Sequence, residues 1–465
     1  MKIVNMFWIF ICLTIFSCKD CTEKKTICEK PPMGFNSYDC YRAYLDQKTA
    51  KKLIDVMAEE YLPFGYEYFV IDAGWYIEYQ VDPVTKLPVQ ALHTTKIVSN
   101  IDENGLPEPS KVYFPDGMKA LADYAHSKGL KFGLHLMRGV IRQAIEEGCT
   151  VKGTDIPVKD IADTLSICTW SKLAYGVDMD KPGAYEYYES MVDKMASWGV
   201  DFIKYDDITA YPREIKAVVE AIEKNPEDIV LSLSPGGDVK MEYLPHYEET
   251  NMLRITSDIW DNQLSIDRTF TGMKSFQGRG RPGFWPDLDM ISLGPLEVFD
   301  VDGTLGTTKK GKRISLLDKN QSYTFITQRA ISATPLFIGG DMLTMDDFTR
   351  QLLTNKDMLA CNQNGVTSFL IYEKDSIEIY KTPERDSPVV KGWLAVFNRK
   401  NTETLIAFYK SDLGFSYNQS VLDKFKKWKD YNLRDIWQSK EYVLKDSIEL
   451  NIPANGVVFV EYEAL

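Results

Sequence analysis

A chain of 465 residues is longer than one ordinary hydrophobic core supports, so we expect two domains. The composition is that of a globular protein, with 44% hydrophobic and 26% charged residues. The net charge of −13 argues against a nucleic-acid-binding protein, because such proteins present a basic face.

The first 18 residues have the order of a bacterial export signal. Lys2 precedes an apolar run, Ile3 to Phe16, that is too short for a comfortable membrane span. Cys18 follows this run, and residues 19–30 form a polar tether. This order resembles a lipoprotein processing site. It predicts a lipid anchor at Cys18 on an exported protein, in the periplasm or attached to the outer membrane of a Gram-negative bacterium. The alternative is ordinary cleavage nearby with Cys18 unmodified.

Histidine and cysteine spacing does not indicate a metal site. None of the four histidines occurs in an HxH or HExxH pattern, which argues against a zinc or binuclear-metal hydrolase. Cys18 and Cys21 form a lone CxxC without a second pair. We therefore predict neither a metal nor a cofactor, and the spacing decides neither disulfide pairing nor oligomeric state.

Short apolar runs alternate with longer amphipathic segments over residues 31–360. The candidate strands are Met33–Tyr38, Tyr68–Trp75, Lys131–Leu136, Val200–Asp206, Ile229–Leu233, Met252–Asp258, Gly283–Met290 and Thr334–Gly339. This α/β alternation predicts a (β/α)8 TIM barrel with enlarged loops. A doubly wound open sheet would also alternate, but no GxGxxG motif follows the first strand.

Residues 361–465 have a different, β-rich pattern. Segments such as Ser368–Tyr372, Gly392–Asn398 and Val457–Tyr462 alternate or are β-rich, with turn residues between them. They predict a C-terminal antiparallel β-sandwich that carries no catalytic constellation.

Polar and aromatic side chains gather where the predicted barrel strands end. They are Asn36, Tyr38, Asp72, Trp75, Asp206, Ser234, Asp258, Asp287, Asp289 and Asp341. The active site of a TIM barrel lies on this face. One such aspartate could cap the next helix, but so many together favour a site. Two long connections, 77–115 and 140–182, are expected to wall it.

Alternation along each strand selects the residues for chemistry. Lys204 and Asp206 share one face of their strand, and Asp207 points the other way. The residues that share a face on two later strands are Arg254, Thr256 and Asp258, and Trp285, Asp287 and Asp289. Several carboxylates beside a lysine, an arginine and flat tryptophan rings suit glycoside hydrolysis by paired acids.

The same strand ends carry motifs that resemble glycoside hydrolase family 27, the α-galactosidase (melibiase) family. The matching segments are Pro32-Met-Gly-Phe-Asn-Ser-Tyr, Ile71-Asp-Ala-Gly-Trp, Lys131-Phe-Gly, Lys204-Tyr-Asp, Arg254 with Ser257-Asp-Ile, Trp285-Pro-Asp-Leu-Asp-Met and Ala333-Thr-Pro-Leu-Phe-Ile. They keep the family's order from about Pro31 to Asp341. Asn455-Gly-Val-Val-Phe-Val resembles the ending of the family's sandwich.

The resemblance implies a retaining exo-glycosidase. By motif position, Asp206 is the expected nucleophile and Asp258 the expected general acid/base. Asp206 must be ionised to attack the anomeric carbon, and a nearby Lys204 ammonium favours that form. Asp258 must first carry a proton and later act as a base on water. Carboxyls with these roles are expected to lie about 5–5.5 Å apart.

The resemblance also implies a sugar pocket. Its expected residues are Asp72, Trp75, Lys204, Arg254, Trp285 and Asp289, with Ser234 at the end of the fifth strand. Three places depart from the commonest family pattern. Ala73 replaces the second of two consecutive aspartates, and Ser234 replaces a glutamate near the sugar 2-position. His135-Leu-Met-Arg-Gly-Val replaces a tyrosine-containing turn. The departures lie on the sugar-recognising walls.

The expected substrate is a carbohydrate, and the expected reaction is hydrolysis of terminal α-D-galactosyl residues of oligo- or polysaccharides. β-L-Arabinopyranoside ranks second. Its sugar has the ring stereochemistry of α-D-galactose without the hydroxymethyl group, and a missing carboxylate at Ala73 weakens the hold on galactose by about 1.5–3 kcal/mol. N-acetyl-α-galactosaminide ranks third, because Ser234 leaves space near the 2-position.

Two alternatives stay open at this point. Another loop, through Arg138 or His135, could supply the contact that Ala73 lacks, so that plain α-galactosidase activity persists. The chain could also be a lipoprotein that binds glycans without cleaving them. The second reading is disfavoured because pure binding does not require both carboxylates with their Lys204 and Arg254 partners.

Overall fold

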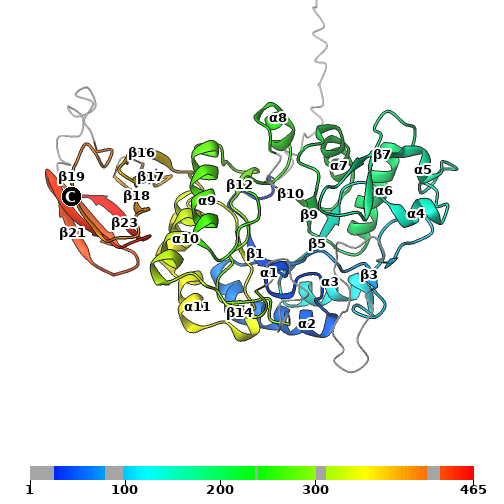
Figure 1. Cartoon of the computed structure of the whole chain (residues 1–465), viewed down its shortest axis with the longest axis horizontal. Helices are drawn as coiled ribbons and strands as arrows, with labels where there is room; N and C mark the ends of the chain where they lie inside the picture. Colours follow the sequence, from blue (N-terminus) through cyan, green and yellow to red (C-terminus); the bar gives the residue numbers. More distant parts are fainter. Residues whose placement is uncertain (1–25, 79–97, 236–238, 300–309, 389, 416–429) are drawn as a thin grey trace, which may run out of the picture.

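The computed structural model describes residues 26–78, 98–235, 239–299, 310–388, 390–415 and 430–465 (Figure 1). The predicted signal peptide, Cys18 and most of the tether lie outside these residues. None of the helices within the described ranges is long and apolar enough to cross a membrane.

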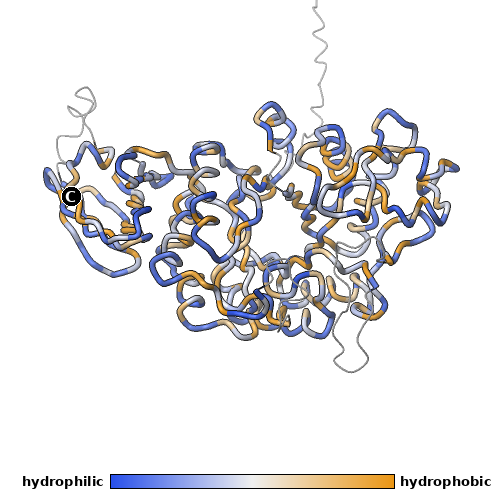
Figure 2. Tube along the Cα trace, in the orientation of Figure 1, coloured by the Kyte–Doolittle hydropathy of each residue, from blue (hydrophilic) through white to orange (hydrophobic). Residues whose placement is uncertain are grey.

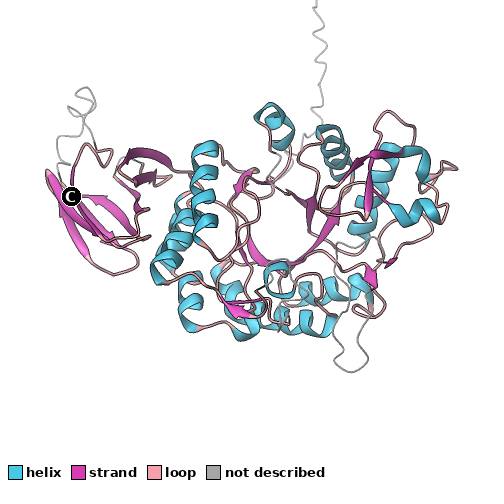
Figure 3. Ribbon diagram, in the orientation of Figure 1, coloured by secondary structure: helices cyan, strands magenta, loops and turns pink. Residues whose placement is uncertain are grey.

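Eight parallel strands form the barrel at the centre of the larger domain (Figure 3). They are β1 (Met33–Asn36), β2 (Tyr68–Ile71), β5 (Lys131–Met137), β9 (Phe202–Asp206), β10 (Val230–Leu233), β11 (Met252–Arg254), β12 (Trp285–Asp287) and β15 (Leu336–Ile338). Their order is β12-β11-β10-β9-β5-β2-β1-β15. Ile291, just beyond β12, forms a parallel bridge with Ile338 of β15 and brings the sheet edges together. The predicted barrel is thus confirmed.

Amphipathic helices surround the barrel, chiefly α2 (Gln47–Val56), α3 (Gly117–Ser127), α6 (Ala184–Ser197), α7 (Pro212–Lys224), α9 (Gln263–Phe276) and α10 (Lys319–Ile331). Capping side chains fix the residue at which several of these helices begin. The side chain of Asp46 accepts a hydrogen bond from the Thr49 amide and caps α2. Asp318 and Gln321 form a reciprocal capping box at α10. Hydrophilic stretches lie mainly at the outer turns (Figure 2).

The long connection after β5 carries a small sheet of its own. Strands β6 (Val140–Ile141), β8 (Ala174–Val177) and β7 (Ala162–Ile167) pair antiparallel in the order β6-β8-β7. This inserted sheet places Trp170, which follows β7, at the cavity on the open end of the barrel. The predicted role of this connection as a wall is therefore matched by a folded subdomain.

The C-terminal strands form two antiparallel sheets. The six-stranded sheet has the order β16 (Phe369–Lys374), β17 (Ile377–Pro383), β18 (Lys391–Asn398), β23 (Val457–Ala464), β20 (Tyr431–Asp435) and β21 (Glu441–Leu444). The second sheet pairs β19 (Thr404–Tyr409) with β22 (Ser447–Ile452). Alternate residues of β18 serve two cores, since Leu394 and Val396 pack between the sheets while Phe397 contacts Phe270 of α9. This confirms the predicted sandwich and shows how it rests on the barrel.

Several strands end earlier than predicted, and two of these matter for the site. β11 ends at Arg254 and β12 at Asp287, although the apolar pattern extends each by several residues. Asp289 has a positive φ of 72°, so the chain has left the extended conformation there. Alternation therefore applies only up to Arg254 and Asp287; beyond them Asp258 and Asp289 still line the cavity, but Thr256 does not. Thr256 is buried, and its methyl group lies against Gly272 of α9, away from the face predicted for it.

Candidate active site

A cavity of about 640 Å³ opens at the C-terminal ends of the barrel strands. The residues that line it are Tyr38, Asp39, Asp72, Ala73, Trp170, Lys204, Asp206, Pro235, Arg254, Ser257, Asp258, Ile259, Trp260, Arg268, Asp289 and Met290. Lys204 and Asp206 belong to β9 and Arg254 belongs to β11. Tyr38 and Asp39 lie on the short helix α1 (Tyr38–Tyr41) after β1, Arg268 lies on α9, and the remaining residues lie on connections after strands. Both predicted catalytic aspartates are among the residues that line the cavity.

The floor of the cavity holds a buried ion pair. Lys204 Nζ donates to Asp72 Oδ2 at 2.7 Å, and Asn36 Nδ2 donates to the same oxygen at 2.8 Å. Burial alone would raise the pKa of Asp72, but the positive charge of Lys204 and its hydrogen bond outweigh burial and lower that pKa. Burial lowers the pKa of Lys204, and Asp72 and Asp206 more than compensate, so Lys204 keeps its charge.

Asp206 ends β9 and is mostly buried, with 14% of its side chain exposed. Its Oδ2 lies 3.1 Å from His135 Nε2, and its Oδ1 has no hydrogen-bond partner in the described part of the chain. Burial raises the pKa of this carboxyl, but Lys204 and His135 hold it well below its usual range. Asp206 is therefore ionised, as a nucleophile must be.

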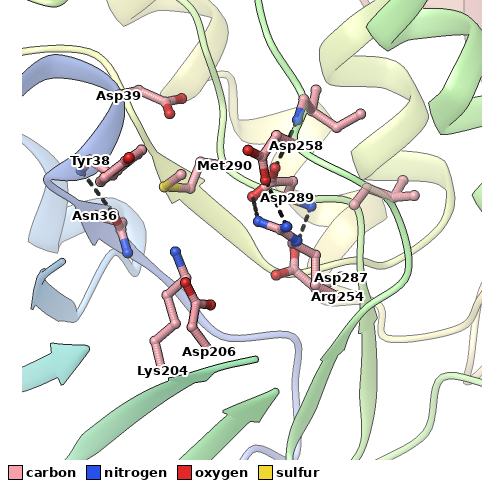
Figure 4. Close-up of polar contacts among 12 residues, drawn as sticks. Asn36, Tyr38, Asp39, Lys204, Asp206, Arg254, Asp258, Asp287, Asp289 and Met290 are labelled. Carbon is pink, nitrogen blue, oxygen red and sulfur yellow. Dashed lines mark hydrogen bonds and ion pairs between the residues drawn. The ribbon is translucent and has the colours of Figure 1, made fainter. Parts of the chain in front are cut away.

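Asp258 lies on the loop after β11, and 66% of its side chain is exposed. Arg254 Nη2 donates to Asp258 Oδ1 at 2.7 Å, and Arg254 Nη1 donates to Asp289 Oδ1 at 3.4 Å (Figure 4). The amide of Ile259 donates to Asp289 Oδ2 at 2.9 Å and ties this loop to β12. Arg254 thus stands between two carboxylates, on the opposite side of the cavity from Lys204 and Asp206 (Figure 4).

Two further carboxyls near Asp289 carry raised pKa values. Burial, with the charge of Asp289, raises the pKa of Asp39 to about 7, and Asp39 accepts a hydrogen bond from Ser292 Oγ at 2.7 Å. Burial and Asp289 likewise raise the pKa of Asp287 to about 7. Both are therefore partly protonated near neutral pH, which limits the negative charge crowded around Asp289.

The two tryptophans predicted to shape the pocket lie elsewhere. Trp75 and Trp285 are fully buried, and neither lines the cavity. The indole of Trp75 donates to the His135 carbonyl at 2.8 Å, and that of Trp285 donates to the Cys28 carbonyl at 2.8 Å. Each ring has its polar atom satisfied by backbone, so it packs as core. The prediction of an aromatic surface from these two residues is wrong.

The residues at which the sequence departs from the family pattern occupy different places in the structure. Ala73 lines the cavity beside Asp72. Ser234 is buried, and only its neighbour Pro235 reaches the cavity wall. Arg138 binds Asp207 and Glu214 on the outer side of β9, so it does not supply the contact that Ala73 lacks. Gly236 and Gly237 lie outside the described residues.

Sequence reasoning missed four residues of the site. Asp39, Trp170, Trp260 and Arg268 all line the cavity. Trp170 and Arg268 lie in a long connection and on a helix, where strand alternation gives no signal. Trp260 stacks on the guanidinium of Arg42, 4.2 Å from ring centroid to Cζ. The position of Trp260, two residues after Asp258, was the one available signal in the sequence.

Within the described residues, no group of three or more histidine, cysteine, aspartate or glutamate side chains is arranged to hold a metal ion. The site consists of the ionised, buried Asp206, the second aspartate Asp258 across the cavity, and the cationic side chains of Lys204 and Arg254. On a (β/α)8 barrel, these features define a glycoside hydrolase.

Known proteins specify the family. A family model described as alpha-galactosidase A matches residues 161–364. The α-galactosidase A of Cellvibrio japonicus is 26% identical over 460 residues, covering 93% of this chain and 91% of the relative. The crystal structure of a family 27 β-L-arabinopyranosidase from Geobacillus stearothermophilus is 32% identical, with a TM-score of 0.83, and covers 94% of this chain and 96% of that one. This chain belongs to glycoside hydrolase family 27.

Proposed function

We propose that the chain is a retaining exo-glycosidase that works by double displacement. Asp206 attacks the anomeric carbon while Asp258 gives a proton to the leaving oxygen. Asp258 then takes a proton from water, which releases the sugar from Asp206. The observation that carries this proposal is the single cavity lined by an ionised Asp206 and an exposed Asp258.

Arg254 has a specific part in this cycle. Without substrate, its guanidinium is committed to Asp258 and Asp289. The fork of donors on Arg254 also suits a vicinal diol. A bound sugar would compete for this guanidinium and free Asp258 to turn toward the leaving oxygen. Lys204 and Asp72 are placed to bind hydroxyls deeper in the cavity.

For the sugar itself, we propose terminal β-L-arabinopyranose first and α-D-galactose second, which reverses the order expected from the sequence. Ala73 lines the cavity next to Asp72, where a second carboxylate would otherwise meet the substrate. The similarity to a β-L-arabinopyranosidase at 32% identity supports this order over the 26% identity to an α-galactosidase. N-acetyl-α-galactosaminide ranks third, because buried Ser234 contributes no cavity surface.

Ala73→Asp is expected to move the preference toward galactose. A carboxylate at this position can accept a charge-assisted hydrogen bond from the hydroxymethyl group that only galactose has. Such a bond should raise the ratio of kcat/KM for α-D-galactoside over β-L-arabinopyranoside by about 10- to 150-fold. The measurement is kcat/KM for both aryl glycosides in the native protein and the variant.

Ala73→Asn is the matched control, since it fills the same space without the charge. We expect it to shift the ratio much less than the aspartate does. If the native protein prefers galactoside, or if Ala73→Asp leaves the ratio unchanged, position 73 does not set the specificity.

We also propose that the protein is exported and anchored through Cys18. The support is the order of Lys2, the apolar run and Cys18 in the sequence. Protein made in a Gram-negative host should partition into the detergent phase, and Cys18→Ala should shift it to the aqueous phase. Cys21→Ala provides the matched control and should still partition into detergent. A native protein found in the aqueous phase would refute the anchor.

A further inference from the structure

His135 is the one buried histidine that contacts a catalytic residue in the described part of the chain. It lies on β5, where strand pairing sets it opposite Lys204 of β9. Its side chain is fully buried, and its Nε2 lies 3.1 Å from Asp206 Oδ2. Its backbone carbonyl accepts the indole N–H of buried Trp75 at 2.8 Å. The ring of His135 is therefore held by Asp206, and its backbone is held by Trp75.

The hydrogen-bonding capacity of the two partners determines which atom donates. Ionised Asp206 can only accept, so the proton of this bond belongs to His135 Nε2. The other ring nitrogen, Nδ1, is buried and has no hydrogen-bond partner within the described residues. A proton on Nδ1 would be a buried donor without an acceptor, which is costly. The geometry thus favours a neutral ring with its hydrogen on Nε2.

We propose that His135 is a positioning residue that holds the Asp206 carboxylate for attack. It does not line the cavity, so it acts on the substrate only through Asp206. Its N–H fixes the rotation of the carboxylate about its terminal bond, while Oδ1 is buried and has no hydrogen-bond partner within the described residues. The inference rests on the proposed function, because it takes Asp206 as the nucleophile.

The same hydrogen bond acts in both halves of the reaction. In the first, a bond forms between Asp206 and the anomeric carbon, the bond to the leaving oxygen breaks, and Asp258 supplies the proton. In the second, water adds to the anomeric carbon and gives its proton to Asp258, and the Asp206 ester bond breaks. The His135 N–H stabilises the carboxylate that departs in this second half.

His135→Phe removes the donor and keeps a ring of similar size, whereas His135→Gln keeps an N–H donor at nearly the same reach. We expect His135→Phe to lower kcat by about 10- to 150-fold, the range of one hydrogen bond to a charged group. The inhibition constant of free L-arabinose should change less than about twofold, because His135 touches no sugar. His135→Gln should recover most of the lost kcat.

Labelling by an activated 2-fluorinated β-L-arabinopyranoside, followed by peptide mass spectrometry, separates the inference from the function on which it rests. Absence of a label on Asp206 in the native protein would refute the proposed nucleophile. A label on Asp206 that forms as fast in His135→Phe as in the native protein would overturn the positioning role alone. Equal losses of kcat in His135→Phe and His135→Gln would also overturn it, since ring packing would then be the cause.

Discussion

Replacing Asp206 with asparagine is expected to lower kcat by about 10⁴-fold or more on every glycoside. The amide is neutral and cannot form the covalent glycosyl-enzyme, so the loss should not depend on the leaving group. Initial rates on aryl β-L-arabinopyranoside and aryl α-D-galactoside measure this effect. Near-normal turnover on either would mean that another residue is the nucleophile.

Asp207→Asn is the matched control for Asp206→Asn. The two aspartates are adjacent, but Asp207 pairs with Arg138 and does not line the cavity. We expect the control to keep kcat within about tenfold of the native value. Its Tm should fall, because the substitution weakens a buried ion pair. This contrast separates loss of chemistry from loss of stability.

Asp258→Asn is expected to show a second large effect that does depend on the leaving group. General acid catalysis contributes about 10²- to 10⁴-fold, so glycosides with sugar leaving groups should lose activity in that range. Dinitrophenyl glycosides need little protonation to depart, so their first step should be slowed much less. The measurement is kcat/KM across aryl glycosides whose leaving groups differ in pKa.

Azide provides the second half of the Asp258 test. This anion needs no general base, so it should accelerate release of the sugar from Asp206 in Asp258→Asn and yield a glycosyl azide. It should have no such effect on the native protein. An equal loss of activity for all leaving groups, with no effect of azide, would remove Asp258 from the role of acid and base.

The sequence predicts the barrel well, because each of the eight apolar runs corresponds to one buried strand. Within β9, alternation correctly separates Lys204 and Asp206 from Asp207, which binds Arg138 on the outer side. Beyond the end of β11, the same rule fails for Thr256, because the chain is no longer extended. Alternation is a property of the strand and stops where the strand stops.

Contacts between strands are harder to predict. His135 reaches Asp206 only because β5 pairs with β9 in a register that sets His135 opposite Lys204. No local pattern contains that register. The prediction that Trp75 and Trp285 face the pocket failed for a related reason. Their indole N–H groups donate to the carbonyls of His135 and Cys28, which are distant in the sequence. A hydrogen-bonding partner for a large ring decides whether it packs as core or faces a ligand.

Retention of configuration at the anomeric carbon is the most direct consequence of attack by Asp206. Proton NMR during the first minutes of hydrolysis of an aryl β-L-arabinopyranoside can follow the sugar before mutarotation. Two displacements predict that β-L-arabinopyranose appears first and that the α anomer grows in later. Appearance of the α anomer first would mean a single displacement by water, and it would contradict the role assigned to Asp206.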